Sequence, residues 1–105
     1  MYTVNTSFMV EPDAHEHWLQ IIRTKYVPFL RENGYDRILL TRVLESEMMG
    51  HFTYSLQVVV EDIEQYQHLS GKLFEEYVQI MTPIFGEKVL WFTSLLKHID
   101  TDVEA

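Results

Sequence analysis

The five histidines are the side chains of this chain best suited to acid–base or metal chemistry near neutral pH. His15 and His17 stand two residues apart, so on a helix they point about 200° apart and do not easily share one ion. The i, i+4 pair of a helical zinc motif and all thiolate ligands are missing, because the chain has no cysteine. His51, His68 and His98 are isolated in the sequence. We therefore expect no metal site, and interpret His15 and His17 as exposed residues at a helix start.

Motifs of nucleophilic or phosphate chemistry are also missing. Ser7, Ser55 and Ser70 lack the G-x-S-x-G context of a nucleophile elbow. The four glycines form no phosphate-cradling loop. The acidic cluster at 61–64 is explained by the dipole of the helix that it opens. We assign no catalytic residue and expect no cofactor.

Composition excludes further partners. A net charge of −8 and a pI near 4.9 repel phosphate backbones, so we expect no nucleic-acid binding. No apolar stretch approaches the roughly 18 residues that span a bilayer, and the N-terminus reads as a strand rather than a signal peptide. With 47% hydrophobic residues the chain can build a folded core. We expect a cytoplasmic protein without membrane contact.

The elements that position these residues follow from hydrophobic periodicity. Alternating apolar residues predict strands, and apolar residues three and four apart predict helices. A short connection containing Gly50 joins the second and third strands into a hairpin. The predicted strands cover 2–10, 36–46, 51–60 and 88–98, and the predicted helices cover about 12–34 and 61–85.

This β-α-β-β-α-β order predicts an α+β fold, a ferredoxin-like four-stranded antiparallel sheet with both helices on one face. Strands 2–10 and 51–60 take its centre. We expect one domain over residues 1–99 and an acidic tail over 100–105. The strand at 88–98 is apolar on both sides, which predicts burial on both faces. We also expect these aromatic residues in the core: Trp18, Tyr26, Phe29, Phe74, Tyr77, Trp91 and Phe92.

The face of the sheet turned away from the helices is the most informative functional feature. Small polar residues of the two central strands alternate with apolar residues that should face the helices. The outer strands add large apolar groups to the same open face, and a domain of this size should not leave it in water. We therefore predict a homodimer that packs sheet on sheet. The residues expected in or near its interface are Asn5, Ser7, Ser55 and Gln57.

Three segments together resemble an uncharacterised bacterial family known as a domain of unknown function, over nearly the whole chain. They are "YTVNTSFMVEPDAHEHWLQIIRTKYVPFL", "RVLESEMMGHFTYSLQVVV" and "FGEKVLWFTSLL". The most specific pieces are "EPDAHEHWL", "FTYSLQ" and Gly86 before the last strand. The resemblance implies a dimeric α/β barrel and no known activity. That superfamily also contains antibiotic-biosynthesis monooxygenases, haem-degrading enzymes and stress-responsive barrel proteins.

The same resemblance suggests where a ligand would lie. Haem-degrading members carry an Asn on the first strand and a His on the second helix, which Asn5 and His68 match. Their Trp on a middle strand has no counterpart here. Ligands in the superfamily lie between sheet and helices, where the hydroxyl groups of Tyr26, Tyr54 and Tyr77 would orient them.

Two functions follow. The first is a small cytoplasmic homodimer that binds a small molecule or a partner and has no recognisable catalytic machinery. The alternative is a cofactor-independent monooxygenase or haem-handling enzyme.

Overall fold

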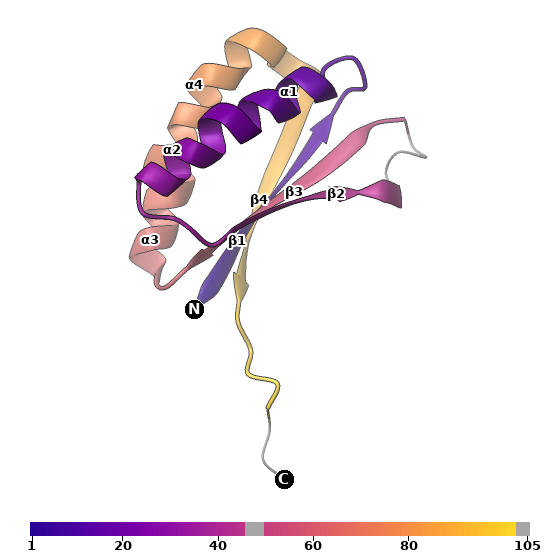
Figure 1. Cartoon of the computed structure of the whole chain (residues 1–105). Helices are drawn as coiled ribbons and strands as arrows, with labels where there is room; N and C mark the ends of the chain where they lie inside the picture. The colour runs from indigo at the N-terminus through magenta and orange to yellow at the C-terminus, as the bar shows by residue number, and fades with distance from the viewer. Residues whose placement is uncertain (46–49, 103–105) are drawn as a thin grey trace.

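A computed structural model describes residues 1–45 and 50–102 of the chain. Its elements follow the predicted β-α-β-β-α-β order, and each predicted helix consists of two α-helices with a π-helical segment between them (Figure 1). The strands are β1 (Tyr2–Val10), β2 (Ile38–Val43), β3 (Phe52–Val60) and β4 (Val89–Lys97). The α-helices are α1 (His15–Ile21), α2 (Val27–Glu32), α3 (Ile63–Gln67) and α4 (Phe74–Phe85).

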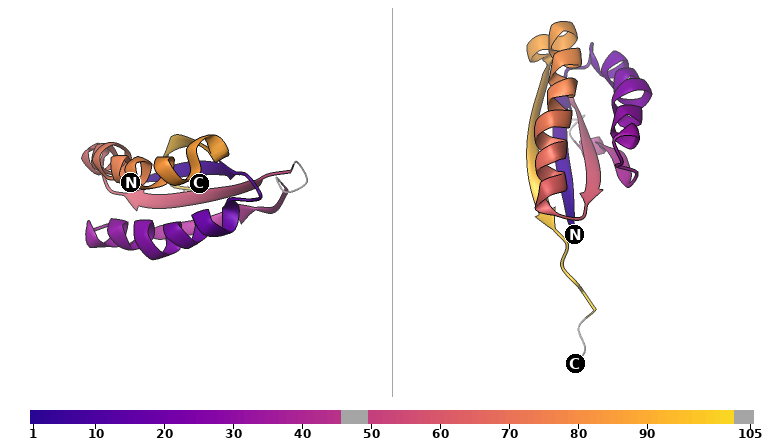
Figure 2. Two further views of the ribbon diagram at one scale, coloured as in Figure 1. Left: turned by 90° about the horizontal axis from the view of Figure 1, so that it is seen from above. Right: turned by 90° about the vertical axis from the view of Figure 1, so that its left-hand side faces the viewer.

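The four strands form one antiparallel sheet in the order β2-β3-β1-β4. The predicted central position of the first and third strands is therefore confirmed. All four helices lie on one face, with α3 and α4 over the β1–β4 half and α1 and α2 toward β3 and β2 (Figures 1 and 2). The other face is called the open face below.

A π-helical segment joins the α-helices of each pair, over Ile22–Tyr26 and His68–Leu73. In the first segment the Val27 N–H bonds to the Ile22 carbonyl, five residues back. Pro28 follows within the first turn of α2, where its missing N–H is tolerated. The irregularity of the helix thus lies just before Pro28. The wider turn takes up one extra residue, as π-bulges do.

The core lies between the helices and the inward residues of β1 and β3. Phe8, Trp18 and Tyr77 form its centre, with the Phe8 ring 5.0 Å from the Trp18 ring and 5.1 Å from the Tyr77 ring. The Trp18 Nε1–H donates to the Tyr77 hydroxyl at 2.9 Å. All three side chains are at most 1% exposed. The predicted inward face of the two central strands is confirmed, since Val4, Leu56 and Val58 are buried there too, at 3% exposure each.

Some sequence predictions are wrong for the single chain, including the core positions expected for Trp91 and Phe92. The last strand is not buried on both faces, because β4 is an edge strand and lacks a covering layer on the open face. Leu90 is 57% exposed and Phe92 55%, and Trp91 on the helix side is 38% exposed. The second strand is also shorter than predicted and covers only Ile38–Val43. Residues 46–49, which hold the end of the predicted second strand and most of the hairpin connection, and residues 103–105 of the tail lie outside the described residues.

Candidate functional site

The open face carries the polar residues that the sequence predicted for an interface. Asn5 lies directly opposite Gln57, and Ser7 directly opposite Ser55, on the two central strands. The Ser55 hydroxyl donates a hydrogen bond to the Asn5 side-chain oxygen. The four side chains are half-buried. The structure thus brings them together as one polar stripe along the middle of the sheet.

Apolar residues border this stripe on both sides. On β2, Leu39 is 57% and Val43 40% exposed. On β4, Leu90, Phe92 and Leu96 stand opposite Met9, Ser7 and Thr3 of β1, and these three β4 residues are exposed as well. The open face is therefore polar in its centre and apolar along its edges.

Near Tyr26 and Tyr77, core side chains fill the space between sheet and helices where a ligand pocket was predicted. Tyr26 and Tyr77 are buried in the core, and burial raises the pKa of both hydroxyl groups. The cavity beside Tyr26 has a volume of only about 20 Å³. Such a cavity holds about one water molecule and no organic ligand.

His68 and Asn5, the pair that matched the haem-degrading enzymes, lie on different sides of the sheet. His68 belongs to the helical layer, where its Nδ1 is 2.9 Å from the Tyr35 hydroxyl. Asn5 lies on the open face. Within one subunit the two side chains therefore do not face a common space.

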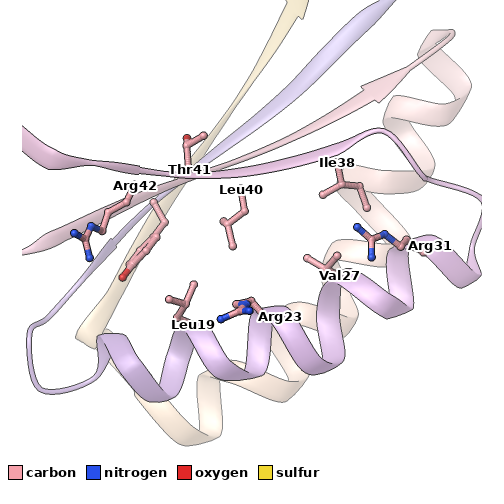
Figure 3. Close-up of a pocket in the computed structure, with 9 residues that line it drawn as sticks. Leu19, Arg23, Val27, Arg31, Ile38, Leu40, Thr41 and Arg42 are labelled. Carbon is pink, nitrogen blue, oxygen red and sulfur yellow. The ribbon is translucent and has the colours of Figure 1, made fainter.

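A larger hollow lies beside Tyr54, which is the only one of its lining residues that the sequence predicted for a ligand site. A groove of about 530 Å³ runs between β2 and the helices α1 and α2 (Figure 3). Its size falls in the range of small-molecule sites. Ile38, Leu40 and Arg42 point into it from β2, while Thr41 points away (Figure 3). Among the described residues, the lining consists of Leu19, Arg23, Val27, Arg31, Ile38, Leu40, Thr41, Arg42 and Tyr54.

Aromatic and polar groups surround the Arg42 end of this groove. The Tyr54 hydroxyl and His15 Nδ1 are hydrogen-bonded at 3.1 Å. The His15 ring stacks on Phe52 with 3.7 Å between ring centroids, and the Arg42 guanidinium lies 5.9 Å from the Phe52 centroid. His15 is therefore half-buried, which corrects its interpretation as an exposed residue, whereas His17 is exposed.

The sequence contains one signal for the groove that lies outside the predicted site residues. Leu19, Arg23, Val27 and Arg31 recur every four residues. Twelve regular α-helical residues rotate about 1,200°, which leaves positions 19 and 31 about 120° apart. The π-helical segment takes up one residue, so the rotation equals about eleven α-helical residues and the offset falls to about 20°. The interruption thus keeps Leu19 and Arg31 along one side of the helix.

Other kinds of site find no support among residues 1–45 and 50–102. No cluster of three or more His, Asp or Glu side chains there is suited to hold a metal ion. In the same described residues, no helix is long and apolar enough to cross a membrane.

These features define a ferredoxin-like α+β protein with an open sheet face and a groove between sheet and helices. A solved structure with the same fold is a dimeric ferredoxin-like protein from an uncultured marine organism. It has 14% sequence identity and a TM-score of 0.57, and the match covers 95% of this chain and 97% of that chain. No curated protein matches the chain. Residues 1–99 match the family model of the domain of unknown function DUF4286, and the chain belongs to this family.

Proposed function

We propose that this protein is a homodimeric binding protein whose subunits pack through the open face and whose ligand site is the groove. The observation that carries the dimer is the exposure of Leu90, Phe92 and Leu96 on one face of β4, beside the polar stripe. Large apolar side chains gathered on one face are typical of protein interfaces. That the similar solved structure is described as dimeric supports the same assembly here.

The size of the open face is sufficient for such a dimer. Nine-residue strands are about 30 Å long, and four strands together are about 19 Å wide. The flat footprint is therefore roughly 550 Å², and side chains make the real surface larger. A standard interface buries about 800 Å² on each partner, which is a comparable area.

The chemistry of the face suits a two-fold arrangement. In a symmetric dimer the same patch meets itself, so the central stripe packs against the partner's stripe. The short side chains of Ser7 and Ser55 let the two sheets approach closely, and the Asn5 and Gln57 amides can both donate and accept hydrogen bonds there. The apolar borders then exclude water from the edges. Binding in the groove is compatible with this dimer, because the groove lies on the helix side of the sheet.

The experiment is a measurement of the molar mass in solution by light scattering at micromolar concentration. We expect a dimer for the native chain and a monomer for Phe92→Asp, because the change places a carboxylate in the apolar border. Gln57→Arg should weaken the dimer through the central stripe. Ile84→Asp is the matched control, since Ile84 is 48% exposed on α4, away from the open face. A native monomer, or a folded Phe92→Asp dimer, contradicts the proposal. The cytoplasmic location expected from the sequence stays a prediction.

A further inference from the structure

We propose that the groove between β2 and the helices α1 and α2 binds a small amphiphilic anion, a molecule with a hydrocarbon body and one carboxylate. This inference deepens the binding role proposed above and does not depend on the dimer. Its basis is the concentration of positive charge at an apolar surface. Three of the four arginines of the chain line this one groove, and none of the lining residues within 1–45 and 50–102 is acidic.

Two of these arginines have charges that the described protein does not neutralise. Within residues 1–45 and 50–102, neither Arg23 nor Arg31 takes part in an ion pair. Both side chains are exposed, and both extend from the helix toward the groove (Figure 3). The chain has 16 acidic and eight basic residues, and among the described residues these two arginines stand beside an apolar surface without an acidic partner. An anion that enters the groove supplies the missing partner.

The apolar part of the groove is built to take a hydrocarbon. Ile38 and Leu40 of β2 face Leu19 and Val27 of the helices across the hollow (Figure 3). Leu19, Ile38 and Leu40 are half-buried, so a ligand would remove the rest of their surface from water. The β2 segment from Ile38 to Arg42 is about 13 Å long, which sets the length of the apolar body.

The rim supplies groups that recognise a carboxylate. Arg23 and Arg31 each offer a planar guanidinium that can donate two parallel hydrogen bonds to it. Arg42 lines the same groove from β2. Beside it, the Tyr54 hydroxyl is hydrogen-bonded to His15 and lines the same part of the groove.

The experiment is calorimetric titration of the protein with three probes that share one chain length, namely decanoate, decan-1-ol and decyltrimethylammonium. We expect decanoate to bind at least ten times more tightly than either of the others. The double variant Arg23→Gln/Arg31→Gln should weaken decanoate binding at least tenfold and leave decan-1-ol binding nearly unchanged. The matched control is Lys25→Gln/Arg37→Gln, which removes the same charge from two exposed residues outside the groove lining.

The outcomes separate this inference from the proposed dimer. Equal affinities for decanoate and decan-1-ol, or equal losses in the two double variants, would show that the arginines only cover apolar surface, and would overturn the inference. Binding of decanoate at the open face would survive Arg23→Gln/Arg31→Gln and fail with Phe92→Asp, which also contradicts the inference. A native monomer that still binds decanoate through Arg23 and Arg31 would contradict the dimer alone.

Discussion

Alkaline pH should unfold this protein through its buried tyrosines, and Tyr26 allows the effect to be measured. Tyr26 is 3% exposed, and burial, with a further contribution from Tyr77, raises the pKa of its hydroxyl group. The unfolded chain releases this proton near pH 10, whereas the folded chain retains it. The stabilisation is therefore complete below about pH 10 and is lost as the pH rises further.

The magnitude follows from proton linkage. Above about pH 10 each such tyrosine lowers the free energy of unfolding by about 1.4 kcal/mol per pH unit. Between about pH 9 and pH 11 the integrated loss is about 1.4 kcal/mol for Tyr26. The Tyr26→Phe variant cannot ionise at this position, so its loss over the same interval should be smaller by that amount.

The assay is urea denaturation of the native chain and of Tyr26→Phe at both pH values, followed by circular dichroism. Val58→Ala is the control, because it weakens the core without changing the number of ionisable groups, and its loss should equal that of the native chain. Having no cysteine, the chain offers no thiol chemistry that could interfere at high pH. Parallel losses in the native chain and Tyr26→Phe would refute the reasoning.

Two further predictions concern stability at neutral pH. Tyr77→Phe removes the acceptor of the Trp18 N–H and should lower the free energy of unfolding by about 1–3 kcal/mol in urea denaturation, whereas an unchanged midpoint would show that another group accepts this bond. Gly86 has φ +55° and ψ −127°, so Gly86→Ala should lower the melting temperature, whereas Gly71→Ala, at a helical position with open space around it, should stabilise by about 0.5–1 kcal/mol. Equal effects of the two glycine changes would contradict this backbone argument.

Sequence patterns predicted the central sheet well because β1 and β3 each alternate over nine residues. That alternation determines which side chains face the helices, and it correctly grouped Asn5, Ser7, Ser55 and Gln57. The exposure of β4 was not predictable from its own residues. An apolar strand looks the same whether helices or a second subunit cover it, and only the strand order places β4 at an edge.

The groove could not be predicted because its two walls are far apart in the sequence. Leu40 and Arg42 alternate as an ordinary strand, and the helix residues opposite them look like an apolar stripe interrupted by Arg23. Tyr54 was the one lining residue chosen as a candidate, for its hydroxyl group. Tyr26 and Tyr77, which were predicted to line the same ligand pocket as Tyr54, are core residues instead. Their rings fill the space that a ligand would need.

The π-helical turn at Ile22–Tyr26 also bears on how the family can change in length. Since this turn stores one surplus residue, deletion of Thr24 should convert it into a regular α-helix and keep Leu19 and Arg31 in phase. A second deletion would remove a residue from a regular α-helix. It would rotate one end of the helix about the helix axis by about 100° relative to the other end. The segment between β1 and β2 should therefore tolerate the loss of one residue and not of two, so the bulge lets this helix lose one residue without changing the direction of its ends.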